Sequence, residues 1–172
     1  MKKNLILTAA IGFQLSQLQL FIKSLREHYK DEICFVIGSK DIKIEDELKK
    51  HNCICIKTKI DKRDIQLKRY KIFLNFLKDK KFDKILFCDS RDIYFQANPF
   101  EYQYKGSINF FLEDKKIKDC KFNSEWITKT YGNRVLSELS EKTISCGGTI
   151  LGSHKCMEEF LSLMIRETGE HK

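Results

Sequence analysis

The sequence predicts an α/β fold in which a mainly parallel central sheet is flanked by helices. Short apolar runs of strand length alternate with amphipathic stretches of helical spacing between residues 5 and 88, which is the pattern of a parallel sheet. With 172 residues, 42% of them hydrophobic, and one proline, the chain has the composition of a folded globular domain. We therefore expect a single Rossmann-like domain over residues 1–172, with a core that needs neither disulfides nor a structural metal.

The N-terminal segment opens with a basic start and a short apolar run, Leu5–Phe13, which also resembles a signal peptide. Thr8 interrupts this run, and no clear cleavage site of small residues follows it. A first buried strand at Leu5–Leu7 is therefore the favoured interpretation.

The remaining elements follow from apolar spacing. Continuous apolar runs bounded by turn residues predict strands, and apolar residues three or four positions apart predict helices. The expected strands are 33–37, 53–56, 85–88, 108–112 and 149–151, and the expected helices are 18–29, 42–50, 65–77, 126–139 and 157–165. No repeat, low-complexity segment or linker divides the chain.

The formal net charge of +8 favours anionic partners. No apolar run approaches the roughly 18 residues of a membrane span, so we expect no transmembrane helix. The lysine clusters are scattered and are not interleaved with aromatic residues, so we expect no nucleic-acid partner. Loose contact with an anionic membrane surface stays open.

Seven cysteines, an odd number, indicate a reducing compartment. Cys53 and Cys55 lie on the same side of a predicted strand, but no second cysteine pair or histidine pair completes a metal site, so core packing is favoured. The histidines have no metal-ligand spacing and are expected to be surface or packing residues. They are His28, His51, His154 and His171.

The segment Asp89-Ser90-Arg91-Asp92 directly follows the predicted strand 85–88. In open parallel sheets, ligands bind outside the carboxyl ends of the strands, where the strand order reverses. Two carboxylates suit Mn²⁺ or Mg²⁺ with phosphate oxygens completing the coordination shell, so the substrate would carry a diphosphate. The alternative is structural: Asp89 caps a turn and Arg91 pairs with Asp92 at the surface.

Two further segments are candidates on weaker grounds. Gly147-Gly148 lies between apolar residues, where it marks either a close backbone approach to a ligand or a structural turn. Glu113-Asp114 ends a predicted strand and offers a catalytic base or nucleophile by position, although a solvated turn explains it equally well.

Together these segments resemble the GT-A type nucleotide-diphospho-sugar glycosyltransferases, over nearly the whole chain. The most specific stretch is residues 84–100, KILFCDSRDIYFQANPF, which resembles the strand, acidic metal motif and trailing segment of bacterial surface-polysaccharide enzymes. The family motif is Asp-x-Asp, whereas this chain has Asp-x-x-Asp, with Asp92 at the family's distance from Pro99.

The resemblance implies a GT-A-like domain that is truncated at its C-terminus, with a nucleotide- and metal-binding half at 1–100 and a donor-sugar and acceptor half at 101–172. It also implies site roles. Thr8 and Ala9 would line the nucleoside pocket, Asp89 would face the ribose or the metal, Asp92 would ligate the metal, Arg69 and Arg91 would meet phosphate, and Gly147-Gly148 would form the donor-sugar loop.

The function that the resemblance implies is metal-dependent transfer of a sugar from a nucleoside-diphosphate sugar, with a UDP-sugar favoured, to a saccharide or lipid-linked acceptor. The expected location is the bacterial cytoplasm, and a peripheral position at the inner face of the membrane stays open. Because the family normally continues beyond such an end, we expect these residues to bind nucleotide but to transfer sugar poorly alone.

Two other classes compete with this interpretation. One is a non-catalytic basic module of the same fold that binds a membrane or a partner. The other is a metal-dependent nuclease built on Asp92 and Glu113-Asp114-Lys115, although the strand and helix alternation before Asp92 is too long for that compact core.

Overall fold

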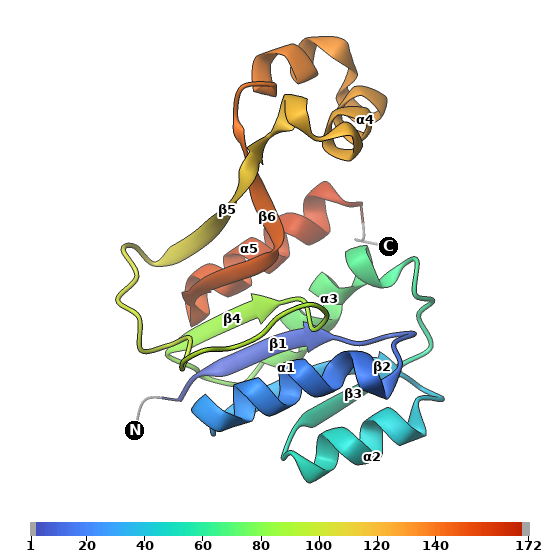
Figure 1. The fold of residues 1–172 in the computed structure, drawn as a ribbon, viewed down its shortest axis with the longest axis vertical. Helices are drawn as coiled ribbons and strands as arrows, with labels where there is room; N and C mark the ends of the chain where they lie inside the picture. Colours follow the sequence, from blue (N-terminus) through green and yellow to red (C-terminus); the bar gives the residue numbers. More distant parts are fainter. Residues whose placement is uncertain (1–2, 170–172) are drawn as a thin grey trace. The chain divides into compact units, whose positions relative to one another are not determined.

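The computed structural model describes residues 3–169 and contains one six-stranded sheet in the order β3-β2-β1-β4-β6-β5 (Figure 1). The chain forms two compact units. Within the described residues, the first comprises 3–109 and 150–169, and the second comprises Phe110–Thr149.

The first unit contains four parallel strands, which confirms the predicted class. They are β1 (Leu5–Ala9), β2 (Glu32–Gly38), β3 (Ile54–Thr58) and β4 (Lys84–Cys88). β1 pairs in parallel with β2 on one side and with β4 on the other, and β2 pairs in parallel with β3. The strand order therefore reverses between β1 and β4.

Four helices accompany this sheet: α1 (Leu15–His28), α2 (Ile42–Lys50), α3 (Ile65–Leu77) and α5 (His154–Glu167). Figure 1 shows α1 and α2 together on one face, while α3 packs with α5 on the other. Successive strand side chains point to opposite faces, so Leu5 and Leu7 join the core beneath α3 and α5. On the α1 face, the rings of Phe21 and Phe35 meet edge to face, with their centroids 5.8 Å apart.

The second unit is built from most of β5 (Ile108–Lys116), the short 3-10 helix η1 (Ile117–Asp119), α4 (Lys121–Leu139) and the first part of β6 (Thr143–Ser153). Gly132 has a φ of 83° and kinks α4. α4 has no buried residue, so it lacks the regular spacing of buried apolar side chains that marks a helix packed on a core.

Three sequence predictions for this second region are corrected by the structure. β5 continues to Lys116, so Glu113-Asp114 lies inside a strand and not at its end. β6 begins at Thr143, so Gly147-Gly148 is part of a strand and not of a loop before one. α4 starts at Lys121, ahead of the predicted start at Trp126.

The cysteines and histidines of the described residues fit the predicted structural roles. All seven cysteines are free, and Cys34, Cys53 and Cys88 are buried. The ring of His154 stacks on Phe82 and its Nδ1 accepts a hydrogen bond from the Phe82 backbone N–H. His171 lies outside the described residues. Within residues 3–169, none of the helices combines the length and the apolar character that a membrane crossing requires.

Candidate functional site

A cavity of about 300 Å³ opens at the carboxyl ends of β1 and β4, where the strand order reverses. All of its walls belong to the first unit. They comprise Ala9, Ile11, Phe13, Lys62, Ile65, Gln66, Arg69, Asp89, Ser90, Arg91 and Asp92. Its volume lies within the range of small-molecule pockets, and its position is the usual ligand crevice of an open parallel sheet.

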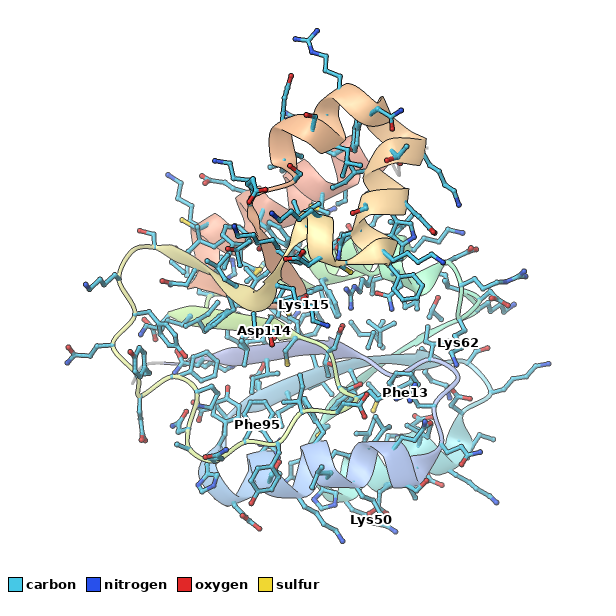
Figure 2. All side chains as sticks on the ribbon, turned by 45° about the horizontal axis from the view of Figure 1, so that its top comes forward. Phe13, Lys50, Lys62, Phe95, Asp114 and Lys115 are labelled. Carbon is cyan, nitrogen blue, oxygen red and sulfur yellow. The ribbon has the colours of Figure 1, made fainter. Side chains whose placement is uncertain are left out.

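The loop after β1 forms one wall. The Ala10 N–H donates to the Val36 carbonyl at 2.8 Å, which keeps the chain beside β2 before it turns at Gly12. Gly12 has a φ of 72°, and a Cβ at this position would lie 3.0 Å from the Cδ atom of Lys62. The left-handed backbone favours glycine at this position, and the loop brings the Lys62 side chain against it. Figure 2 shows Phe13 and Lys62 near one another at this end of the sheet.

Ser90 connects the second strand of the site to the first. Its side chain is almost fully buried, with 1% exposure, and its hydroxyl donates to the Ala9 carbonyl at 2.8 Å. This bond fixes the start of the acidic segment to the end of β1. The segment Asp89–Asp92 therefore starts at a fixed position next to the end of β1.

Arg69 is the buried cation of the site. Ile65 and Gln66 precede it by four and three positions on α3, so all three residues lie on one helix face toward the cavity. Its guanidinium donates to Asp89 Oδ1 at 2.6 Å and lies 4.6 Å from the ring centroid of Phe87. The residue is only 6% exposed, and among the described residues its Nε–H has no hydrogen-bond partner.

Arg69 lines the cavity, and the positive charge of its guanidinium favours a ligand with anionic oxygens there. A guanidinium suits phosphate oxygens because it presents several N–H groups in a planar fork.

Asp92 adopts a left-handed backbone conformation, with a φ of 61°. Aspartate and asparagine tolerate this region better than most residues, and Asn52 and Asp79 adopt it outside the cavity. Its carboxylate lies 3.3 Å from the Arg91 Nε, and both side chains are exposed, at 54% for Arg91 and 83% for Asp92. The surface ion pair between Arg91 and Asp92, which the structural alternative predicted, is thus present. Because Asp92 is exposed, its carboxylate is also accessible to a ligand.

No group of three or more histidine, cysteine, aspartate or glutamate side chains gathers anywhere in residues 3–169, so no cage built from protein ligands is formed there. Asp89 and Asp92 line the same cavity and offer hard carboxylate oxygens. Mn²⁺ or Mg²⁺ often takes only one or two carboxylates and completes its shell with phosphate oxygens and water, so these two residues fit a cation that arrives with phosphate.

Burial raises the pKa of the Cys88 thiol, and the neighbouring Asp89 charge raises it further. This thiol lies at the end of β4 beside the acidic segment, yet it stays protonated near neutral pH. It is therefore unsuited to act as a nucleophile.

The structure brings Ala9, Arg69, Asp89, Arg91 and Asp92 together around the cavity. Thr8 is not among the residues that line it: its side chain is buried, and its hydroxyl has no partner among the described residues. The alternation of β1 explains this, because neighbouring residues point to opposite faces.

The remaining candidates lie in the second unit. Glu113 and Asp114 are exposed on β5, and Asp114 is labelled in Figure 2. Gly147 lies in β6, where an added Cβ would meet no atom within 4 Å, so the protein itself does not require glycine there.

Sequence reasoning gave no site role to six lining residues, which are Ile11, Phe13, Lys62, Ile65, Gln66 and Ser90. Gln66 could have been found from its position one helical turn before Arg69. Phe13 and Lys62 come from two loops, and no local sequence pattern shows that these loops meet.

No protein-family model matches the sequence, and no curated protein matches it significantly. Solved structures do match its fold. The apo form of the glycosyltransferase GlyE from Streptococcus pneumoniae TIGR4 aligns with a TM-score of 0.54 and 17% identity, over 99% of this chain and 39% of that chain.

Glucosyl-3-phosphoglycerate synthase from Mycobacterium tuberculosis, in complex with UDP, aligns with a TM-score of 0.54 and 10% identity, over 97% of this chain and 66% of that chain. The same enzyme in complex with Mn²⁺, UDP-glucose and glycerol 3-phosphate aligns with a TM-score of 0.52. The chain thus has the fold of these glycosyltransferases, which confirms the expected GT-A-like architecture, and it spans between about two fifths and two thirds of their length.

Proposed function

We propose that this chain is the nucleotide-binding part of a glycosyltransferase that takes a sugar from a nucleoside-diphosphate sugar, with a UDP-sugar favoured. The observation that carries the proposal is the cavity at the β1–β4 reversal, which is lined by the cationic Arg69 and by the carboxylates of Asp89 and Asp92. A diphosphate with a divalent cation satisfies both kinds of group. The fold shared with enzymes solved in complex with UDP and Mn²⁺ supports this choice.

In this proposal, the cationic side chains of the cavity bind and orient the diphosphate. Arg69 is held in place by Asp89 and by the Phe87 ring, so its guanidinium needs little reorganisation when the ligand enters. Arg91 and Lys62 add two flexible cations at the rim. When the bond between the sugar and the diphosphate breaks, these charges stabilise the departing phosphate.

Asp89 and Asp92 are the residues that would hold Mn²⁺ or Mg²⁺. When bound, this cation supplies Lewis-acid stabilisation of the leaving diphosphate. We assign the acceptor class as a saccharide or a lipid-linked saccharide. Glu113 and Asp114 stay our candidates for the base or nucleophile, and Gly147-Gly148 stays our candidate for the donor-sugar contact.

The test is calorimetric titration of UDP with and without Mn²⁺, on the wild-type chain and on Asp92→Asn. We expect binding in the presence of Mn²⁺, and a loss of at least about tenfold in Asp92→Asn, since a charge-assisted contact contributes roughly 1.5–3 kcal/mol. Asp46→Asn is the matched control because Asp46 is an exposed carboxylate on α2 that does not line the cavity. Equal loss in both variants, or UDP binding that is indifferent to Mn²⁺, would contradict the proposal.

A further inference from the structure

Two shallow hollows adjoin the cavity on the first unit, at the same edge of the sheet. One, of about 560 Å³, lies between the starts of α1 and α2 and shares Phe13 with the cavity. Its apolar wall comprises Phe13, Leu15, Ile42 and Ile44, and Ile42 is 62% exposed. Covering an exposed isoleucine with an apolar ligand is favourable, because it removes apolar surface from water.

The second hollow, of about 490 Å³, lies over the loops that follow β2 and β3. It shares Lys62 with the cavity and Lys40 with the first hollow. The three depressions therefore form a continuous surface beside the proposed nucleotide site.

Four exposed lysines gather on this surface: Lys40, Lys43, Lys59 and Lys62. Within residues 3–169, none of them has an ion pair, although most exposed cations elsewhere on helices pair with a carboxylate three or four residues away. We name these four lysines together with Ile42 the basic edge.

The two carboxylates that line the hollows do not neutralise the basic edge, because two negative charges offset only part of four positive ones and Asp61 also pairs with Arg63. Asp41 accepts a hydrogen bond from the Gly38 N–H at 3.0 Å. Asp61 accepts from the backbone N–H of Arg63 at 2.9 Å and pairs with its guanidinium at 3.3 Å. The surface therefore presents a net positive charge around an apolar hollow.

We propose that the basic edge docks on an anionic lipid surface, and, resting on the proposed function, that the acceptor is carried by that membrane. Lysines at the level of anionic headgroups and an aliphatic side chain at the acyl boundary are the combination that binds a lipid interface. Single-stranded nucleic acid would instead be expected to meet several exposed aromatic rings on which bases stack, and Phe13, which is half-buried, is the one aromatic residue among those that line the two hollows. Docking at this edge brings the nucleotide cavity close to the membrane plane.

The experiment is co-sedimentation of the chain with vesicles of phosphatidylcholine alone or of equal parts phosphatidylcholine and phosphatidylglycerol. The test variants are Lys40→Gln/Lys43→Gln and Ile42→Asn. The matched control is Lys78→Gln/Lys81→Gln, which removes the same charge from two exposed lysines beyond the C-terminal end of α3 that, within residues 3–169, have no ion pair either. Thermal melting of each variant checks that it folds.

We expect binding to the phosphatidylglycerol vesicles alone, a loss of about tenfold or more in Lys40→Gln/Lys43→Gln, and a smaller loss in Ile42→Asn. The control double variant should bind as the wild type does. Equal loss in both double variants, equal binding to neutral vesicles, or no vesicle binding would overturn the proposal. Binding of a single-stranded DNA oligonucleotide with the same dependence on Lys40 and Lys43 would also overturn it.

UDP titration of the same variants separates this inference from the proposed function. Lys40 and Lys43 do not line the nucleotide cavity, so Lys40→Gln/Lys43→Gln should bind UDP with Mn²⁺ as the wild type does. Retained UDP binding without lipid binding in the wild type would remove the docking surface and leave the proposed function standing. Lipid binding without UDP binding would remove the proposed function and leave the docking surface standing.

Discussion

The two compact units differ in the interactions that hold their helices and strands together. In the first unit, apolar side chains from β1, β2, β4, the end of β6 and four helices are buried on both faces of the sheet. In the second unit, Ile144 is the one buried apolar residue among those described, while Phe122, Trp126 and Tyr131 are each more than 60% exposed. The second unit is held instead by backbone bonds such as Ile117 N–H to the Lys142 carbonyl, at 2.9 Å, and by surface ion pairs. Burial of apolar side chains stabilises the first unit, whereas local hydrogen bonds and ion pairs stabilise the second.

The largest expected effect of this difference is on stability. Phe87 is fully buried, and its ring meets Tyr70 and Phe73. Phe87→Ala should therefore lower the free energy of unfolding by about 3–5 kcal/mol, whereas Trp126→Ala should change it by less than about 0.5 kcal/mol. Urea unfolding followed by circular dichroism measures both.

A conservative Phe87→Leu variant should recover a large part of the loss, because it refills much of the cavity. If Trp126→Ala proved as destabilising as Phe87→Ala, the second unit would depend on apolar burial after all, and the comparison would fail.

The next effect concerns nucleotide binding. Arg69→Met removes a buried cation from the cavity and leaves Asp89 half exposed to water, so the chain should fold but bind UDP with Mn²⁺ about ten to a hundred times more weakly. Arg134→Met is the counterpart in the second unit, since Arg134 is 91% exposed and pairs only with Glu138 among the described residues. Calorimetry should show no change for Arg134→Met, and a similar loss in both variants would rule out a specific role for Arg69.

The same contrast explains how far the sequence predicted the structure. In the first unit, the strands 33–37 and 85–88 and the helix 65–77 were predicted to within a residue or so, because a strand buried on both faces requires a continuous apolar run. In the second unit, residues 113–116 extend β5 although they are charged and exposed, since backbone pairing and not side-chain burial continues the strand. Hydrophobic periodicity does not report such pairing.

The candidate site was also predicted only where an apolar strand positions its residues. The segment 89–92 was found because it follows an apolar strand, and the sheet topology carries such a segment to the ligand-binding edge. The partnership of Arg69 with Asp89 joins residues 20 positions apart, on different elements. The approach of Lys62 to Gly12 joins two loops. Both depend on tertiary packing, which one sequence does not encode in any local spacing.

A smaller effect distinguishes two thiols, one from each unit. Hydrogen bonds from the backbone and side chain of Asn123 lower the pKa of Cys120 at the start of α4, whereas burial raises the pKa of Cys88. A lower pKa gives more thiolate at a given pH, so iodoacetamide should modify Cys120 well before Cys88 near neutral pH. Peptide mapping by mass spectrometry measures the order. Denaturant should abolish the difference, and modification of Cys88 first in the folded chain would contradict the burial of β4.

The smallest effect is a pH dependence confined to the second unit. Glu141 has its pKa lowered from 4.5 to about 2 by hydrogen bonds from Lys116 and Lys118, whose ammonium groups lie 2.8 Å and 2.6 Å from its carboxylate. A carboxyl whose pKa is depressed on folding stabilises the fold above its unfolded pKa, and that contribution is lost as the pH falls from about 4.5 towards 2. All three side chains are substantially exposed, so salt should screen the interaction and the gain should be small. NMR titration should show chemical shifts of Lys118 changing in this pH range in the wild type but not in Glu141→Gln, while Phe87 shifts stay constant. A Glu141 titration midpoint at the ordinary value, or one unaffected by added salt, would show that the lysines do not hold this carboxylate in solution.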